Sequence, residues 1–275
     1  MTFTVAVDHG AGLLAHLPTP RRDAELLLLR AIGKDRAFLL THPDAALTPE
    51  QQSTYEQWLT RRAKHEPIQY ITGEQEFYSL ALRVTPDVLI PRPETEHLVE
   101  ALLTRVSHND ALRIADIGTG SGAIAIALAH HLPHATVTAL DCSRPALAVA
   151  QQNAEHHNVA GRIRFVESDL LDAVASETFD AIVSNPPYVP NSEVLEEQVR
   201  NFEPHTALYA GSSGLDIYQR LIPRAWQSLK SQGWLMMEIG HGQQNALANL
   251  LTEWNNVEFI RDLQQIPRVA IARRS

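Results

Sequence analysis

The sequence has very little cysteine: Cys142 is the only one among 275 residues. One thiol cannot form an intrachain disulfide or a cysteine metal cluster, so we expect neither of these and no bound metal. Long apolar runs are also missing, since no stretch reaches the ~18 consecutive apolar residues of a membrane helix. The first residues lack the basic and then apolar pattern of a signal peptide. We therefore expect a cytoplasmic protein without a membrane segment.

Positive charge is scarce as well. The chain has 23 Lys and Arg residues against 32 Asp and Glu residues, a formal net charge of −9. This balance argues against broad contact with a phosphate backbone, although a local basic groove would remain compatible with it. The hydrophobic share of 44% is ordinary for a globular protein, and the length exceeds that of one average domain.

The first part of the chain, residues 1–75, has the pattern of a small helical bundle. Apolar residues recur at helix spacing, and Gly33 is placed to end one helix. Thr48-Pro49-Glu50-Gln51 is typical of a helix start, with Thr48 as the cap and Gln51 closing a capping box. We expect a separate N-terminal domain and hypothesise that it grips a partner.

Residues 76–92 change character, because β-forming residues alternate there before a series of prolines. We interpret this segment as a β-hairpin linker. Arg92 and Glu94 follow, and their proximity predicts a surface ion pair. Residues 93–275 then form the predicted second domain.

From residue 112 onward, apolar strands alternate with helices. This alternation predicts an α/β fold with a doubly wound, mostly parallel, seven-stranded Rossmann-like sheet and helices on both faces. The expected strands are 112–115, 136–140, 163–166, 181–184, 234–239, 257–261 and 269–272.

A glycine-rich turn follows the first of these strands. It consists of Gly118, Thr119, Gly120, Ser121 and Gly122. The glycines allow a tight turn and a close approach to a ligand, and Asp141 at the end of the next strand is placed to accept hydrogen bonds from ribose hydroxyls. The pattern indicates a nucleoside-containing cofactor and fits NAD as well as S-adenosyl-L-methionine. Asp116 favours the latter, because it would repel a pyrophosphate and suit a cationic methionine end.

The tetrapeptide Asn185-Pro186-Pro187-Tyr188 ends another buried strand, where open α/β sheets bind ligands. The prolines have fixed φ and no N–H, so the side-chain oxygen of Asn185 and the neighbouring carbonyls form a stiff group of hydrogen-bond acceptors. Tyr188 adds a flat face. Such a site suits a planar group with an NH2, which is either an amide or the exocyclic amine of a base. No proton-relay residue for hydride transfer accompanies it.

With both motifs identified, the chain resembles the class I S-adenosylmethionine-dependent methyltransferases, and more narrowly the peptide chain release factor glutamine N5-methyltransferases. The resemblance covers nearly the whole chain; its segments are 66–73, 88–96, 116–122, 184–188, 202–204, 214–216 and 238–240. The Asn-Pro-Pro-Tyr motif alone is shared with adenine and guanine amine methyltransferases, whereas the segments 66–73 and 88–96 narrow the family. The segment 262–268 departs from the family pattern.

The resemblance implies a substrate, namely the glutamine in the Gly-Gly-Gln loop of class-1 release factors. Asn185 and Pro186 would accept its amide hydrogens and Tyr188 would pack on the amide. It also implies that the glycine turn holds the methionine end of the cofactor, with S-adenosyl-L-homocysteine as product, while Asp169 and Leu170 lie at the adenine. Asp169 could instead cap a helix. The alternatives are a methyltransferase for DNA, RNA or a ribosomal-protein glutamine, a dehydrogenase, and a non-catalytic cofactor-binding module. We expect a monomer.

Overall fold

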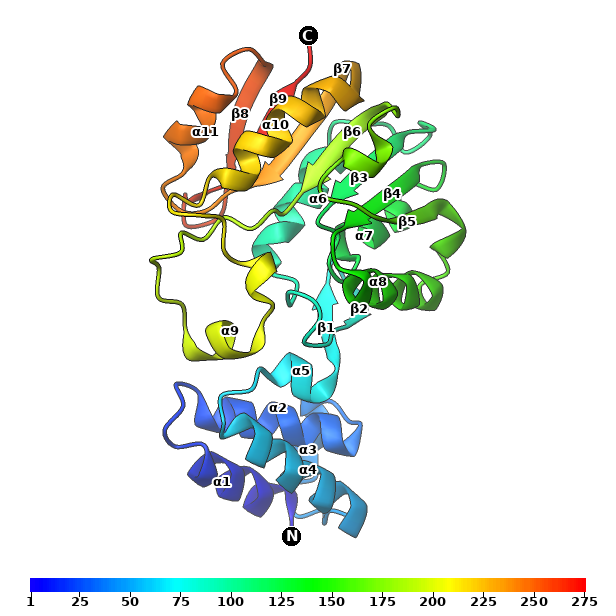
Figure 1. The fold of residues 1–275 in the computed structure, drawn as a ribbon. Coiled ribbons are helices and arrows are strands. Elements are labelled where there is room, and N and C mark those ends of the chain that lie inside the picture. The colour runs from blue at the N-terminus through cyan, green and yellow to red at the C-terminus, as the bar shows by residue number, and fades with distance from the viewer. The chain divides into compact units, whose positions relative to one another are not determined.

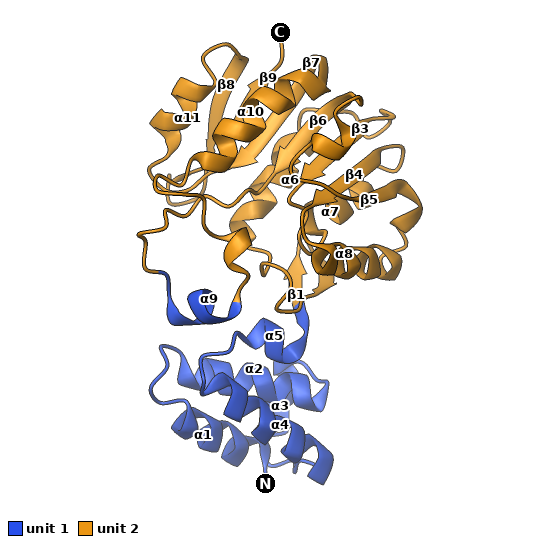
Figure 2. Cartoon of the chain, in the orientation of Figure 1, with its two compact units in different colours: residues 1–74, 195–202 blue, residues 75–194, 203–275 orange.

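The structure is a computed structural model that describes residues 1–275, and it consists of two compact units. Unit 1 comprises residues 1–74 and 195–202, and unit 2 comprises residues 75–194 and 203–275 (Figure 2). The first boundary lies within one residue of the expected one. Residues 195–202 were not expected in unit 1, because this short segment interrupts the second domain of the chain.

Unit 1 is helical throughout. Its helices are α1 (Phe3–Leu13), α2 (Pro20–Ile32), α3 (Arg36–Thr41), α4 (Pro49–Arg62), α5 (Ile68–Thr72) and α9 (Glu197–Phe202). The predicted signals operate as expected. Gly33 ends α2 in the left-handed conformation, and Thr48 and Gln51 form both hydrogen bonds of a capping box at the start of α4.

Tyr55 of α4 is fully buried in the core of unit 1. Its hydroxyl lies 3.1 Å from the carbonyl oxygen of Ala6 and 3.2 Å from that of Ala24, so the polar end of the ring is satisfied. Gly10 of α1 packs directly against this hydroxyl. A Cβ at that position would overlap it and would lie 2.9 Å from the Cβ of Ala24. The close approach of α1 to α4 therefore requires glycine.

A buried ion pair between Arg62 and Asp23 joins several segments of unit 1. Arg62 Nε donates to Asp23 at 2.7 Å, and both side chains are almost fully buried. The second arm of the guanidinium donates to the carbonyl of Glu66 (3.0 Å) and to Gln198 of α9 (3.2 Å). One arginine thus holds α2, α4 and the inserted α9, which explains why residues 195–202 belong to this unit.

Unit 2 begins with a hairpin of β1 (Glu74–Phe77) and β2 (Leu80–Arg83) and continues as an α/β sheet (Figure 1). The order across the sheet is β5-β4-β3-β6-β7-β9-β8; β9 runs antiparallel to both of its neighbours, β7 and β8, and all other neighbouring strands are parallel. The sheet strands are β3 (Arg113–Ile117), β4 (Thr136–Asp141), β5 (Ile163–Glu167), β6 (Phe179–Ser184), β7 (Leu229–Glu238), β8 (Asn255–Arg261) and β9 (Pro267–Arg273). The predicted seven-stranded, mostly parallel sheet is confirmed.

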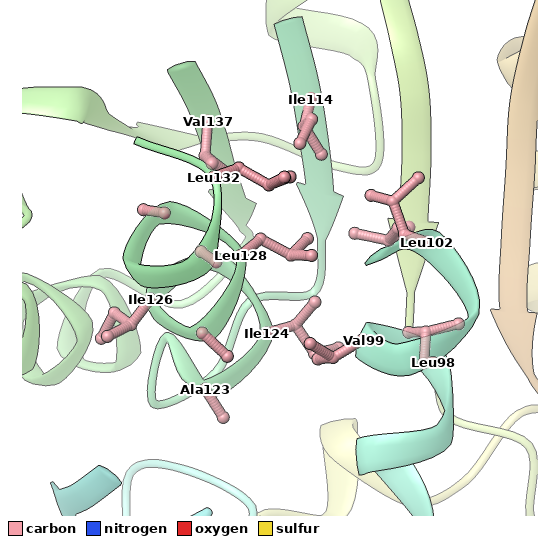
Figure 3. Packing of buried hydrophobic residues seen from close by; sticks show 14 of the residues in the cluster. Leu98, Val99, Leu102, Ile114, Ala123, Ile124, Ile126, Leu128, Leu132 and Val137 are labelled. Carbon is pink, nitrogen blue, oxygen red and sulfur yellow. The ribbon is translucent and has the colours of Figure 1, made fainter. Parts of the chain in front are cut away.

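Helices cover both faces of this sheet because successive strand residues point to opposite sides. Along β6, Ala181 and Val183 face one core and Ile182 faces the other. The first face is covered by α6 (Glu96–Leu103), α7 (Ala123–His131) and α8 (Arg144–His156), and the second by α10 (Asp216–Ser228) and α11 (Gln244–Leu250). Figure 3 shows α6 and α7 packing on the first face, with Leu98 and Leu128 among the labelled residues.

Two local expectations differ from the structure. Strand β7 begins at Leu229 rather than Trp234. Its pairing with β6 is interrupted by an irregularity that contains Gln232 and Gly233, and it resumes at Leu229. Arg92 does not pair with Glu94. Its guanidinium donates to the buried carboxylate of Glu203 at 2.6 Å, a partner 111 residues away that local spacing could not reveal. None of the helices is both long enough and apolar enough to span a bilayer.

Candidate active site

A cavity opens in unit 2 at the carboxyl ends of β3, β4, β5 and β6. Parallel strands end at the same edge of a sheet, so the loops that follow them converge there. Of the residues predicted to form the site, the cavity wall contains Gly118, Thr119, Gly120, Ser121, Asp141, Asp169, Leu170, Asn185, Pro186 and Pro187. The predicted cofactor turn and the acceptor loop therefore lie in one site.

The glycine turn connects β3 to α7 and adopts positive φ at Gly118 (70°), Gly120 (54°) and Gly122 (83°). A Cβ on Gly118 or Gly120 would meet its nearest heavy atom only at 3.9 or 4.0 Å, so it would occupy the cavity itself. At Gly122, a Cβ would lie 2.9 Å from Ile126 and 3.1 Å from Ala150. The first two glycines thus keep space for a ligand, and the third allows the turn to pack against α7 and α8.

Asp141 stands at the end of β4 and orders the neighbouring loops. Its carboxylate accepts from the backbone N–H of Gly120 at 2.9 Å and from that of Ser143 at 2.9 Å. Burial is the main cause that raises the pKa of this carboxyl above its ordinary value. Each oxygen retains acceptor capacity, so the predicted contact with ribose hydroxyls is compatible with these bonds.

Asp116 lies in β3 beside the turn and is fully buried. One oxygen, Oδ2, accepts from Thr119 (2.6 Å) and from the N–H of Ala125 (3.2 Å), whereas Oδ1 has no hydrogen-bond partner. Desolvation raises the pKa of this carboxyl to about 7. Asp116 is not part of the cavity wall, so its predicted preference for the cationic end of the cofactor stays a prediction.

Asp169 and Leu170 follow β5 and line the cavity, with Leu170 held at a positive φ of 53°. The Asp169 carboxylate forms a surface ion pair with Arg220 of α10. This pair leaves acceptor capacity on the carboxylate and is therefore compatible with a contact between Asp169 and an adenine amino group. That contact stays a prediction.

The acceptor loop after β6 is held from behind by a chain of hydrogen bonds. Asn185 Nδ2 donates to Thr95 Oγ1 at 3.1 Å, and the Thr95 hydroxyl donates to Glu238 Oε2 at 2.5 Å. Glu238 ends β7 and is buried. Because Nδ2 is the atom of the Asn185 amide that contacts the protein, Oδ1 remains the group available to a ligand.

Tyr188 is turned toward the same glutamate. Its hydroxyl donates to Glu238 Oε1 at 3.2 Å, and the residue is not part of the cavity wall. Burial beside Glu238 raises the pKa of the Tyr188 hydroxyl, which keeps it a hydrogen-bond donor at neutral pH. Its predicted stacking on a substrate amide stays a prediction.

Gln243 fixes the backbone of the loop. Its Nε2 donates to the carbonyls of Tyr188 (3.0 Å) and Gly214 (3.2 Å), while its Oε1 accepts from Gly240 N–H at 2.9 Å. Gly214 has φ +72°, and a Cβ there would clash with the Tyr188 carbonyl. The end of the acceptor loop is therefore clamped by two segments distant in sequence.

Several site residues could not be found from the sequence motifs. Thr95, Glu238 and Gln243 reach the acceptor loop from positions 90, 50 and 55 residues away from their partners in it. The linker also contributes to the cavity wall, through Val88 and Leu89 among others. The available signal was the family resemblance, because Thr95 and Glu238 both lie within the family segments.

Solved structures that share this architecture include methyltransferases. A ribosomal protein L11 methylase from Lactobacillus delbrueckii subsp. bulgaricus is 26% identical with a TM-score of 0.50, over 70% of this chain and 86% of that one. A 16S rRNA N2 G1207 methyltransferase from T. thermophilus, solved with AdoMet and guanosine, shares the fold at 18% identity with a TM-score of 0.56, over 74% of this chain and 50% of that one. The fold and the site together define an S-adenosylmethionine-dependent methyltransferase.

Relatives in sequence narrow this class. Two family models match, the PrmC N-terminal domain over residues 6–73 and the methyltransferase small domain over residues 94–205. The release factor glutamine methyltransferase of Koribacter versatilis is 45% identical over 100% of this chain and 99% of its own length. That of Escherichia coli is 42% identical over 93% and 92%. The chain belongs to the release factor glutamine methyltransferase family.

Proposed function

We propose that this chain transfers a methyl group from S-adenosyl-L-methionine to the side-chain amide nitrogen, N5, of the glutamine in the Gly-Gly-Gln motif of class-1 peptide chain release factors. The observation that carries the proposal is the orientation of Asn185. Its amide nitrogen donates to Thr95, which leaves its oxygen free to accept from a second carboxamide, and Asn185 lines the cavity. Methylation of this glutamine modulates translation termination.

The chemical task of the site is to make an amide nitrogen nucleophilic, because its lone pair is delocalised into the carbonyl. Asn185 Oδ1 and the Pro186 carbonyl would accept the two amide hydrogens. These bonds fix the nitrogen and stabilise the positive charge that develops on it. The stiffness of Pro186 and Pro187 and the clamp by Gln243 preserve that geometry.

S-adenosyl-L-methionine, when bound, would supply a methyl group activated by its sulfonium; the S–CH3 bond would break as the new N–CH3 bond forms, and S-adenosyl-L-homocysteine would be the leaving group. The chain provides its cradle. Gly118 and Gly120 leave room for the methionine end. Asp141 would bind the ribose, and Asp169 and Leu170 would lie at the adenine; that all three line the cavity supports this assignment. After transfer, the acidified nitrogen releases its proton to water or to a neighbouring carbonyl.

We further propose that the helices of residues 1–75 recognise the release factor, that residues 76–92 act as the linker, and that residues 93–275 carry the transferase. The family model for the N-terminal domain supports this division. The enzyme acts as a monomer in the cytoplasm, where translation takes place. The net charge of −9 argues against a nucleic-acid substrate, although the acceptor loop by itself would also suit an exocyclic base amine.

The test is a methyl-transfer assay with labelled cofactor and three acceptors: release factor, ribosomal RNA and genomic DNA. A release factor whose motif glutamine is replaced by glutamate is the matched control. Label in the wild-type release factor and none in the control supports the proposal. Label confined to nucleic acid would reject it in favour of a base-amine methyltransferase.

A further inference from the structure

We propose that Thr95 and Glu238 are positioning residues that fix which way round the Asn185 carboxamide sits. This inference rests on the proposed function. We call the arrangement a polarity lock, because it fixes whether the donor end or the acceptor end of the Asn185 carboxamide faces the substrate. Neither side chain needs to touch the reacting nitrogen. Thr95 lines the cavity, while Glu238 is buried behind it.

The lock follows from counting hydrogens. A threonine hydroxyl has a single proton, and here it donates to Glu238 Oε2 at 2.5 Å. The Thr95 oxygen therefore has no proton left to donate to Asn185. It can only accept a hydrogen bond, which comes from Asn185 Nδ2 at 3.1 Å. A carboxamide has a donor end and an acceptor end of nearly equal shape. Tying the donor end to Thr95 leaves the acceptor end for the substrate.

The ionised form of Glu238 holds this arrangement in place. As a carboxylate it accepts from Thr95 through one oxygen and from Tyr188 through the other. If Glu238 were protonated, it would be able to donate to Thr95. The Thr95 hydroxyl would then be free to donate to Asn185, and the carboxamide would be free to turn its NH2 toward the substrate. Two amide NH2 groups facing each other cannot bond, so methyl transfer would stop.

The surroundings place the ionisation of Glu238 in the neutral range. Desolvation raises its pKa to about 7, with a further rise from Glu94, while Thr95, Tyr188 and Arg268 favour the charged form. The other titratable group packed here is Tyr218, whose hydroxyl donates to the Glu238 backbone carbonyl at 2.7 Å. Arg268 is itself paired with Asp262 on the turn before β9. The lock is thus set by a carboxylate close to its titration point.

The first test removes the hydroxyl of Thr95 without changing its shape. Thr95→Val is expected to lower kcat by about tenfold, the effect of one lost orienting hydrogen bond, and Thr95→Ser is expected to restore it. The affinity for S-adenosyl-L-homocysteine, measured by calorimetry, should stay unchanged in both variants. A Thr95→Val enzyme with wild-type kcat would overturn the inference.

A double-mutant cycle shows whether Thr95 acts through Asn185. In an Asn185→Ala background, Thr95→Val should cost nothing further, because no carboxamide remains to be oriented. Equal losses in the two backgrounds would assign Thr95 an independent structural role and contradict the lock.

The pH profile tests Glu238. Wild-type kcat should rise with pH through about 7, as Glu238 loses its proton. Glu238→Gln should flatten this limb at a low kcat, because a glutamine has no proton to lose and, like the protonated acid, offers a single acceptor oxygen to Thr95 and Tyr188 at every pH. A limb that survives in Glu238→Gln would belong to another group, such as Asp116, and would reject the role of Glu238. Failure of the wild-type enzyme to methylate the release factor would instead reject the proposed function, so the two failures are distinguishable.

Discussion

At the scale of single residues, the proposed mechanism depends on the side chain of Asn185, whose nitrogen donates to Thr95 while its oxygen remains available. Asn185→Ala removes the acceptor that orients the substrate amide. By comparison with the loss of a positioned oxyanion donor, we expect kcat to fall ~10²–10³-fold. Single-turnover kinetics with saturating cofactor would measure this loss directly.

The same loop offers a matched control in Asn191, whose side chain is exposed and forms no hydrogen bond. Asn191→Ala should keep the wild-type rate. An Asn185→Ala enzyme that retains more than about a tenth of the wild-type kcat, a barrier change of under 1.4 kcal/mol, would show that the acceptor is dispensable.

The residues that we expect to contact a ligand could be identified from the sequence more readily than those that support them. Asn185 and the glycines of the turn are conspicuous in the sequence, because prolines or glycines directly after a buried strand lie at the ligand-binding edge of an α/β sheet. Thr95 and Glu238 are not conspicuous, since a threonine before a helix and a glutamate at the end of a strand are common surface residues. Only the three-dimensional structure reveals that they meet.

At the scale of elements, helix α1 offers a direct test of close packing. Gly10→Ala would place a methyl group against the buried Tyr55 hydroxyl, and overpacking of this kind costs about 1–3 kcal/mol. A Cβ on Gly12 in the same helix would have no heavy atom within 4 Å. Gly12→Ala should therefore be neutral or stabilise by up to about 1 kcal/mol through helix propensity.

Urea unfolding of the two variants measures both effects, and the matched pair cancels what an alanine does to the unfolded chain. Equal midpoints for Gly10→Ala and Gly12→Ala would refute the importance of this packing contact.

Regular elements were predicted well because their signals are local. The alternation of strand and helix and the caps at Gly33 and Thr48 depend on neighbours in the chain. The docking of α9 in unit 1 depends on Arg62, which lies 136 residues from its partner Gln198. Long-range polar contacts of this kind produce no periodic pattern in the sequence. That residues 195–202 belong to unit 1 could therefore not be predicted.

At the scale of the whole molecule, two buried carboxyls make stability depend on pH. Burial raises the pKa of Asp116 from 3.8 and that of Glu238 from 4.5, each to about 7. At pH values between the unfolded and the folded pKa of each group, the folded state binds more protons than the unfolded state. The free energy of unfolding should therefore fall as the pH rises through this range and level off above a pH of about 7. Urea unfolding at a series of pH values would measure the slope.

Glu238→Gln should make that slope shallower, because a glutamine has no proton to lose. An identical pH dependence in wild type and variant would show that Glu238 ionises normally in the folded state. Asp116→Asn provides the parallel measurement for the second carboxyl.

The choice of cofactor is also a property of the whole molecule. Ligands that bind the folded state alone raise its stability, by about 2.7 kcal/mol at a concentration of 100 Kd. We expect S-adenosyl-L-homocysteine to raise the melting temperature and NAD to leave it unchanged. A shift with NAD alone would support the dehydrogenase alternative, which the glycine turn by itself left open.

The most direct test of the central claim is tandem mass spectrometry of a class-1 release factor after incubation with the enzyme and S-adenosyl-L-methionine. We predict the added mass of one methyl group, located on the side-chain nitrogen of the Gly-Gly-Gln glutamine, and none with the Asn185→Ala enzyme. A methyl group on another residue, or an unmodified release factor under conditions where the cofactor binds, would contradict the claim.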